Sequence, residues 1–389
     1  MAVAENQPLS KVQRRLKVAV LNRNFSPTAG GAERYSTAIV EELAAQHDIH
    51  VFAQTIEHNW PCVTYHRISR GFSKPRWLNQ LWYAYAVWRA TRTGFDIIHS
   101  HEAVWFGNVQ TMHVKTVQRS LLGGRSGLAL ALRQIKIILS PRLQTYLGLE
   151  RARIKPQTLR AVLAASQPLA DELLQEYPHV APMLSVITPG VNIPVQFATK
   201  SEARRAISTE ENGKIILFVA NDYVRKGLPA LLQAMQTLPD DIRLLVVGNA
   251  SQIPQFEAIA KTLGIEYRVQ FLGPLKDMHL VYCAADVLAH PTLEDSFGMV
   301  VLEAMAHGLP VLVSRAPYCG LSALLQPGQQ ALVLDDPKDV SNLTAALLRL
   351  LEDVSLRQTI ATGASDFAKG HTWKQAGAAY SVIYQKLSA

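Results

Sequence analysis

Apolar runs and amphipathic stretches follow one another along this chain. The apolar runs 17–25 and 48–54 are short and indicate buried strands, whereas 32–46 has apolar residues at helical spacing. Further strands are predicted at 95–101 and 108–114. Strands that alternate with helices predict right-handed crossovers and a parallel sheet.

The second half of the chain repeats this pattern. Strands are predicted at 214–222, 242–250, 269–273, 286–291 and 310–315, with helices at 227–238, 253–264, 278–285 and 301–308. Residues 187–206, between the halves, contain two prolines and a glycine and predict a hinge. We therefore expect an α/β protein with two Rossmann-like, doubly wound parallel sheets that face a central cleft, where ligands of such sheets bind.

Composition is compatible with two full domains. The chain has 389 residues, 48% of them hydrophobic, and its three cysteines show neither a disulfide framework nor zinc spacing, which favours a reducing cytoplasm. The first ten residues are polar and do not resemble a signal peptide. The longest uncharged run, 177–199, holds four prolines and does not predict a membrane helix.

Charge is divided unequally between the halves. Residues 1–195 contain 22 Lys and Arg against 12 Asp and Glu, whereas the remainder contains 17 against 19. The basic half favours an anionic partner: nucleic acid, an acidic membrane or a phosphorylated substrate. The alternative is that this charge serves solubility alone.

Two turns after predicted strands have the composition of phosphate sites. Gly30 and Gly31 join the first strand to the first helix and let a ligand approach the backbone, although the GxGxxG fingerprint is absent. Arg225 and Lys226 follow the strand at 214–222 and can clamp a diphosphate. A simple tight turn and a solvated basic turn are the respective alternatives.

The stretch 290–311, HPTLEDSFGMVVLEAMAHGLPV, carries the most specific pattern. Its Ser-Phe-Gly turn directs backbone N–H groups toward one place, at the start of a helix that we expect near Met299. Asp295 precedes the turn, and Glu303 lies about two helical turns further on. These carboxylates can hold the hydroxyls at either end of a nucleotide sugar. Alternatively, Asp295 is an N-cap and Glu303 a buried ion-pair residue.

Four motifs together resemble GT-B glycosyltransferases of family 4, from about residue 17 to 389. EDSFGMVVLEAMAHGLPV resembles the family's E-x7-E region, FVANDYVRKG its donor-phosphate loop, PTAGGAERY its N-terminal glycine loop, and ITPGVNI its interdomain stretch. The nearest resemblance is to bacterial lipopolysaccharide-core glucosyltransferases. It implies an N-terminal acceptor domain (1–195), a C-terminal nucleotide-sugar domain (196–370) and a final helix (371–389) that crosses back.

The resemblance also implies roles for individual residues. Glu303 matches the glutamate that binds the donor ribose. Asp295 matches the one that contacts the transferred sugar, but it is one methylene shorter, and Glu294 could compensate. An arginine that the family often has before the basic pair is missing, since Ala220 or Asn221 stands there.

The remaining matches concern the donor phosphates and the sugar. Arg225 and Lys226 match the diphosphate-binding cations, His113 matches an active-site histidine near the sugar, and His101 is a weaker candidate; a packed strand-end imidazole is the alternative for either histidine. The backbone matches for the donor phosphates are Phe297, Gly298, Met299, Gly30 and Gly31.

The implied reaction is transfer of a hexose with retention of configuration, without a cofactor or a required metal. The UDP- or GDP-hexose is a substrate, and the leaving phosphate helps to deprotonate the acceptor. The catalytic candidates are His113, Asp295, Lys226 and Arg225. No protein nucleophile is assigned, and closure about the hinge would complete the site.

The acceptor is expected on the basic lobe. Residues 70–92 and 118–155 combine cations with aromatic or apolar residues, which suits an anionic membrane interface or, alternatively, core helices. We therefore expect a cytoplasmic protein, peripheral on the inner face of the cell membrane, with a glycolipid, lipopolysaccharide-core or other glycan acceptor. A soluble small-molecule acceptor and an inactive scaffold are alternatives. A nucleic-acid-binding protein is disfavoured because no recognition pattern for nucleic acid is present.

Overall fold

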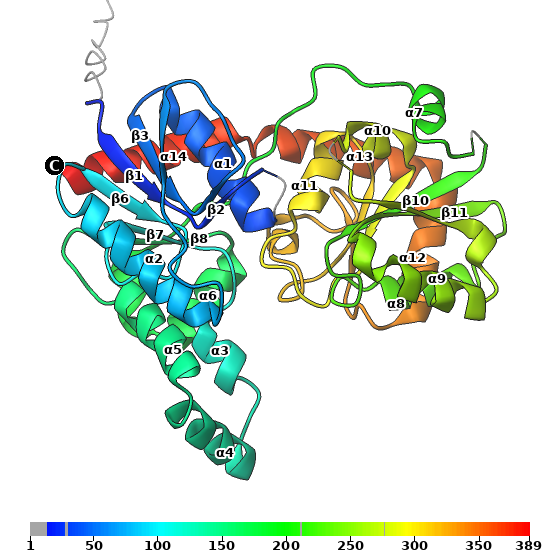
Figure 1. Ribbon diagram of the computed structural model, residues 1–389. Helices are drawn as coiled ribbons and strands as arrows, with labels where there is room; N and C mark the ends of the chain where they lie inside the picture. The colour runs from blue at the N-terminus through cyan, green and yellow to red at the C-terminus, as the bar shows by residue number, and fades with distance from the viewer. Residues whose placement is uncertain (1–13, 28–29, 211, 276) are drawn as a thin grey trace, which may run out of the picture.

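The computed structural model describes residues 14–27, 30–210, 212–275 and 277–389 and places them in two lobes (Figure 1). Each half of the chain builds one lobe, and the last helix returns to the first lobe. The segment 1–13, for which no signal peptide is predicted, lies outside the described residues.

A parallel sheet forms the centre of the N-terminal lobe. Within the described ranges it has seven strands in the order β5-β3-β1-β6-β7-β8-β9, and all neighbouring pairs are parallel. The order runs outward from β1 to both sides, which is the doubly wound arrangement. The strands are β1 (Lys17–Leu21), β3 (Asp48–Ala53), β5 (Val63–Arg67), β6 (Ile97–Ser100), β7 (Val109–Met112), β8 (Ala161–Ala164) and β9 (Leu184–Val186), beside the short pair β2 (Asn24–Phe25) and β4 (Thr55–Ile56).

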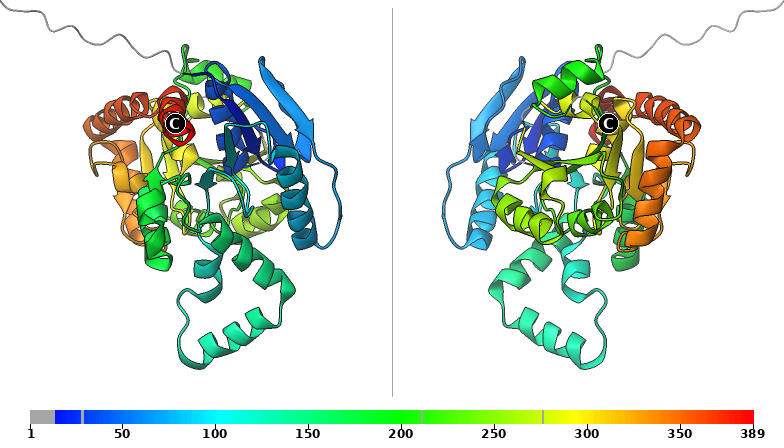
Figure 2. Two further views of the ribbon diagram at one scale, coloured as in Figure 1. Left: turned by 90° about the vertical axis from the view of Figure 1, so that its left-hand side faces the viewer. Right: turned by 90° about the vertical axis from the view of Figure 1, so that its right-hand side faces the viewer.

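The helices of this lobe cover the sheet, apart from one projection. They are α1 (Gly31–Ala44), α2 (Arg76–Thr91), α3 (Val117–Leu122), α4 (Gly127–Ile138), α5 (Pro141–Arg153) and α6 (Gln167–Glu176), followed by a 3-10 turn (Pro178–Met183). Helix α2 buries Tyr83, Ala84 and Val87 against the sheet, so it is a core helix. Figures 1 and 2 show α4 at the tip of a projection from the lobe, and none of its residues is buried.

The C-terminal lobe repeats the architecture. Its sheet has, in the part of the chain described, six parallel strands in the order β12-β11-β10-β13-β14-β15. They are β10 (Lys214–Ala220), β11 (Ile242–Gly248), β12 (Val269–Gly273), β13 (Val287–His290), β14 (Val311–Ser314) and β15 (Leu332–Leu334). Its helices are α7 (Lys200–Ala206), α8 (Leu228–Met235), α9 (Ile253–Thr262), α10 (His279–Ala284), α11 (Met299–Ala306), α12 (Val340–Glu352) and α13 (Val354–Lys369), with 3-10 turns at Ala250–Gln252, Glu266–Arg268 and Leu321–Leu324. The final helix, α14 (Trp373–Ser388), packs on the first lobe.

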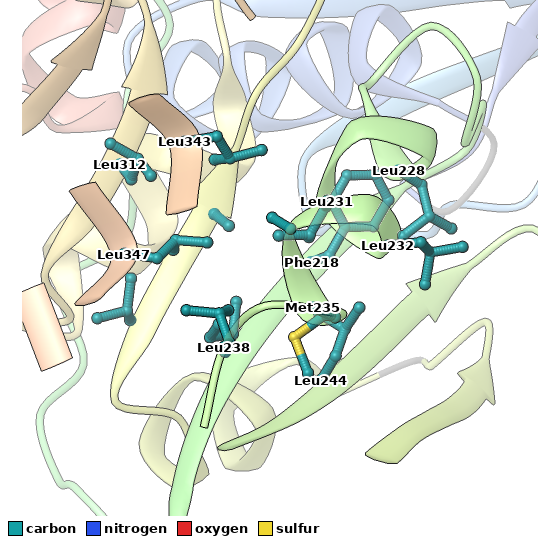
Figure 3. Close-up of a cluster of buried hydrophobic side chains, with 14 of the residues drawn as sticks. Phe218, Leu228, Leu231, Leu232, Met235, Leu238, Leu244, Leu312, Leu343 and Leu347 are labelled. Carbon is teal, nitrogen blue, oxygen red and sulfur yellow. The ribbon is translucent and has the colours of Figure 1, made fainter. Parts of the chain in front are cut away.

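Buried apolar residues lie on both faces of the second sheet, which explains its continuous apolar runs. On one face Phe218 and Leu244 pack with Leu231 of α8 and Leu347 of α12 (Figure 3). Each fully buried leucine contributes about 1.5–3 kcal/mol. The strand ends that carry the functional loops are therefore held on a rigid base.

Two crossings join the lobes and lie against each other. Val191 N–H donates to His371 O at 2.9 Å, so the linker between the lobes pairs with the segment before α14. A Cβ added to Gly190 would lie 2.2 Å from Trp373 N, which requires glycine at this position. The linker is shorter than the predicted hinge 187–206, because the last seven residues of that range form α7.

Helix α14 belongs to the core of the first lobe although it follows the second in sequence. Tyr380 and Tyr384 are fully buried there, and Tyr380 Oη lies 2.8 Å from Tyr35 Oη of α1. The predicted pair of doubly wound parallel sheets is confirmed. The final helix crosses between the lobes, so their relative position involves both chain segments.

Candidate active site

The turn into α11 is built around one glycine. Gly298 has a φ of 102°, and a Cβ added to it would lie 2.7 Å from Cys319 Sγ. Glycine is therefore needed both for the left-handed backbone and for the close approach. Helix α11 begins at Met299, where the sequence predicts it, and its first N–H groups have no intrahelical acceptor.

The loop before this turn is fastened to the chain after β14. Asp295 N–H donates to Tyr318 O at 2.7 Å, and Leu321 N–H donates to Phe297 O at 2.6 Å. The N-cap of α11 is Gly298 and carries no side-chain cap, so the alternative interpretation of Asp295 as an N-cap is wrong.

The Asp295 carboxylate is bound instead by two side chains. Its Oδ2 lies 2.7 Å from Lys226 Nζ and 3.0 Å from His290 Nε2, and its Oδ1 accepts from Phe297 N–H at 3.3 Å. Burial alone would raise the pKa of Asp295, but the His290 hydrogen bond and the Lys226 charge outweigh it and lower that pKa. Burial also lowers the pKa of His290. A neutral His290 therefore donates its Nε2–H to an ionised Asp295.

The basic turn 222–227 lies against the acidic loop. Lys226 Nζ donates to Glu294 O at 2.9 Å, and Leu293 N–H donates to Arg225 O at 2.9 Å. The Arg225 guanidinium extends to exposed Asp222, with Nε 3.6 Å from Oδ2. The fold therefore places Lys226 inside the candidate site and leaves the Arg225 side chain at its margin.

Glu303 lies on α11 and is almost fully buried. Tyr282 Oη donates to its Oε2 at 2.8 Å, and Arg34 Nη1 of the N-terminal lobe lies 2.7 Å from its Oε1. Burial raises the pKa of Glu303, although Arg34 and Tyr282 oppose this shift. The alternative of a buried ion-pair residue therefore describes this structure. Its cation is on the opposite lobe and about half exposed.

The two glycines at the start of α1 lie on the same helix end as Arg34, since Gly30 is the N-cap and Gly31 the first helical residue. Gly30 has an extended backbone with a φ of 175°, and a Cβ added to Gly31 would meet no atom within 4 Å. Neither position therefore needs glycine for its conformation. The open space beside Gly31 is compatible with a ligand at the start of α1.

His113 follows β7 and stacks on His101. Their nearest ring nitrogens are 2.8 Å apart, and Tyr35 packs edge-on against His113 with centroids 4.8 Å apart. Burial, with the charge of Arg153, lowers the pKa of His113 to about 3, so the ring is neutral at physiological pH. A neutral imidazole can donate or accept a hydrogen bond, but carries no charge.

The structure thus brings most of the predicted residues together around the start of α11. The C-terminal lobe contributes Lys226, Asp295, Phe297, Gly298, Met299 and Glu303. Met299 packs against the hydrophobic clusters of both lobes. Gly30 is the N-cap and Gly31 the first residue of α1, the helix that carries Arg34. In the described chain the Arg225 side chain pairs with Asp222 and the His113 ring with His101, and neither makes a hydrogen bond or ion pair to this group.

Sequence reasoning missed several partners. Arg34 stands in the quoted glycine loop, where a cation three residues after Gly31 could have been noticed. His290 opens the quoted stretch 290–311, five residues before its partner Asp295, and could have been noticed as well. Tyr282 and Lys115 had no sequence signal, because tertiary contacts set their partners; Lys115 Nζ lies 3.7 Å from Glu294 Oε2 across the cleft.

Two further cavities are lined mainly by residues outside this group. One of about 370 Å³ lies in the C-terminal lobe beside Phe197, Arg357 and Tyr282, the partner of Glu303, and one of about 520 Å³ lies between Arg160 and Lys386. The cleft itself is occupied by direct ion pairs between the lobes, such as Arg34 with Glu303. A ligand there must displace protein side chains.

Comparison with known proteins decides the family. Residues 29–194 match the family described as Glycosyltransferase Family 4, and residues 199–366 match Glycosyl transferases group 1. The chain belongs to family 4 of the GT-B glycosyltransferases. The resemblance inferred from its four motifs is thus confirmed.

Curated relatives of this family 4 chain have different acceptors in their names. A D-inositol 3-phosphate glycosyltransferase of Xylanimonas cellulosilytica is 30% identical over 239 residues, which is 58% of this chain and 56% of the relative. The lipopolysaccharide glucosyltransferase WaaG of Escherichia coli K12 is 27% identical over 239 residues, 59% of this chain and 63% of the relative. The alignments span a little over half the length of these relatives.

Solved structures share the fold over nearly the whole chain. The crystal structure of WaaG superposes with a TM-score of 0.81 at 22% identity, covering 94% of this chain and 99% of that one. Anabaena Alr3699/HepE in complex with UDP-glucose superposes with a TM-score of 0.69 at 19% identity, covering 94% and 99%. The GT-B architecture is therefore shown.

Proposed function

We propose that this chain is a retaining glycosyltransferase that moves a hexose from a nucleotide sugar to a lipid-linked or lipopolysaccharide-core acceptor. The observation that carries the proposal is the cluster of Lys226, Asp295 and Glu303 around the first turn of α11, opposite α1. Family membership agrees with it, and the printed description of a structural neighbour includes UDP-glucose.

The donor diphosphate fits best at the start of α11. The free N–H groups of the first turn and the Lys226 ammonium supply positive potential there, which favours two phosphates. Glu303 can then accept hydrogen bonds from the ribose hydroxyls once Arg34 has moved away from it. Arg34, about half exposed, remains near enough to balance the phosphate charge.

Transfer requires stabilisation of the departing diphosphate and of the positive charge that develops on the sugar. Lys226 and the helix N-terminus stabilise the first, since their charges are already in place before reaction. The leaving phosphate takes the acceptor proton in a front-face reaction. Neutral His113 contributes a hydrogen bond rather than a charge.

The acceptor is proposed to lie at a membrane surface on the cytoplasmic side, with α4 as the contact. The exposed apolar residues Leu128, Leu132 and Ile135 of α4, with Leu139 at its C-cap, recur at helical spacing and form one face. Arg133 and Lys136 lie on the same helix and favour anionic lipid. None of the helices described is long and apolar enough to span a membrane.

A soluble acceptor is the second candidate, favoured by the relative named for D-inositol 3-phosphate. Co-sedimentation with vesicles of phosphatidylcholine and phosphatidylglycerol separates the two. Binding that is lost in Leu132→Asp supports the membrane acceptor, whereas no binding of the wild-type protein favours the soluble one.

The donor assignment is tested by thermal shift across UDP- and GDP-sugars, because a ligand specific for the native state stabilises it by mass action. A shift of the unfolding temperature should appear with a nucleoside diphosphate, vanish in Glu303→Ala and decrease in Lys226→Ala. The matched control Glu257→Ala, an exposed acid on α9, should keep the full shift. Equal shifts in all variants would refute the site.

A further inference from the structure

We infer that Glu294, and not Asp295, is the acid of the C-terminal lobe that binds hydroxyls of the transferred sugar, and that Asp295 is a positioning residue for Lys226. The inference rests on the proposed function and concerns the part of the site that distinguishes one donor sugar from another.

The Asp295 carboxylate is largely occupied by its own protein. A carboxylate has about four lone-pair sites. Two on Oδ2 are used by Lys226 Nζ and His290 Nε2, and one on Oδ1 by Phe297 N–H. A sugar hydroxyl would have to share the remaining site on a side chain that is 19% exposed. Turning the Asp295 carboxylate away from these partners would leave Lys226 without its counter-ion in a poorly hydrated site.

Asp295 acts on the donor through Lys226. The ammonium group has three donors. One is directed to Asp295 Oδ2 at 2.7 Å and one to Glu294 O at 2.9 Å. One N–H therefore remains for a phosphate oxygen, in a direction that the two acceptors determine. Asp295 therefore fixes the position of the Lys226 charge and does not contact the sugar.

Glu294 has the opposite environment. Its carboxylate accepts no hydrogen bond in the described parts of the chain, and its side chain is 41% exposed. The nearest cation, Lys115 Nζ, is 3.7 Å away, and an exposed pair at this distance stabilises by little. Glu294 can therefore turn to sugar hydroxyls at small cost.

Glu294 also lies in the right place. Its loop follows the carboxyl end of β13, while Lys115 follows the carboxyl end of β7 in the other lobe. The contact between the two side chains therefore lies where the ends of both sheets face each other, which is where open α/β sheets bind ligands. A sugar attached to a diphosphate at the α11 terminus would reach this space.

Calorimetric titration separates the sugar contact from the phosphate contact. The ligands are UDP with UDP-glucose, or GDP with GDP-mannose, whichever pair binds the wild-type protein. Glu294→Gln should weaken the nucleotide sugar about tenfold and leave the free nucleotide unchanged, because one charged hydrogen bond is lost. Asp295→Asn and Lys226→Met should each weaken both ligands by the same factor, and the double variant should be no weaker than Lys226→Met alone. Glu257→Gln on α9 should change neither.

The outcomes distinguish this inference from the proposed function. Two results would overturn the inference and leave the proposed donor site intact. In the first, Asp295→Asn weakens binding of the nucleotide sugar but not of the free nucleotide. In the second, Glu294→Gln binds both ligands as tightly as the wild type does. If neither pair binds the wild-type protein, the proposed function falls and the inference falls with it. Circular dichroism and the unfolding temperature of each variant verify that the fold is intact, and Lys226→Met reports on the positioning role if Asp295→Asn does not fold.

Discussion

The acidic loop 291–298 with Glu303 of α11, and the projecting helix α4, differ in how far their charged and apolar groups are paired or buried by the rest of the protein. Asp295 of the loop and Glu303 are both paired within the chain, and α11, which follows the loop, is largely buried. In α4 no residue is buried, and its apolar face is exposed. The comparison teaches that exposure of apolar area and pairing of charge indicate different partners: the loop suits a small polar ligand, and α4 suits an apolar surface.

The largest expected effect is on the free energy of unfolding, which should respond to truncation of a buried side chain but not of an exposed one. Leu302→Ala in α11 removes a fully buried side chain and should lower the free energy of unfolding by about 2–5 kcal/mol. Leu132→Ala in α4, which is 58% exposed, should change it by less than about 0.5 kcal/mol. Urea unfolding measures both. A large loss in Leu132→Ala would mean that α4 is packed in solution and that the contrast is false.

A second test concerns the turn into α11. Gly298→Ala should destabilise by about 2–4 kcal/mol, because the left-handed backbone costs about 1–2 kcal/mol and the new Cβ also meets Cys319 Sγ at 2.7 Å. Gly308→Ala is the matched control, since its φ is 66° but its Cβ would meet nothing within 4 Å. Equal losses in the two variants, again by urea unfolding, would show that the close packing at Cys319 is unimportant.

The third test measures how much the exposed apolar face of α4 contributes to membrane affinity. Ile135→Asp should weaken binding to anionic vesicles about tenfold, because an exposed apolar side chain that would insert into the lipid is replaced by a charge that anionic lipid repels. Lys136→Gln should weaken it less, and only at low salt. Vesicle titration at two salt concentrations measures this, and Val382→Asp, at an exposed position of α14, serves as control. Unchanged binding in Ile135→Asp would remove α4 from the membrane contact.

The smallest effect is a pH dependence of stability, which has opposite signs for Asp295 and Glu303. The pKa of Asp295 is lowered by folding, so its stabilisation is complete above the unfolded value of about 3.9 and is lost as the pH falls through the folded value. The pKa of Glu303 is raised, so its contribution is complete below about 4.3 and is lost as the pH rises through the folded value.

Unfolding free energies measured from about pH 3 to 7 test this pair of signs. Asp295→Asn should reduce the loss of stability on the acid side, whereas Glu303→Gln should reduce the loss as the pH rises. Curves that change in the same direction in both variants would contradict the assigned environments.

Much of the fold could be predicted from sequence because the signals are local. The strands near 48–54, 242–250 and 269–273 appear within a residue or two of their predicted places, as does the start of α11 at Met299. Strands β5, β8, β9 and β15 were not predicted. Length alone does not explain this, because β6 and β7 have only four residues each and were predicted. For 118–155, local pattern alone did not separate a packed helix from an exposed one.

The candidate site was predictable residue by residue, but its pairings were not. Sequence motifs indicated Asp295 and Glu303, yet the partner of Glu303 is Arg34, which lies in the other lobe. Similarly, Lys226 was expected to bind phosphate, and its contact with Asp295 joins two separate loops. Such pairs depend on how the strand ends meet, which no local pattern encodes.

Short-range periodicity and residues close together in the chain are therefore enough to predict the two parallel sheets, the glycine turn before α11 and the family. The contacts of Asp295 with Lys226 and His290, the open position of Glu294 and the ion pair of Arg34 with Glu303 became visible in the assembled fold alone. The physical reason is that burial and ion pairing are properties of assembled surfaces. They arise only when the ends of separate strands and the two lobes come together.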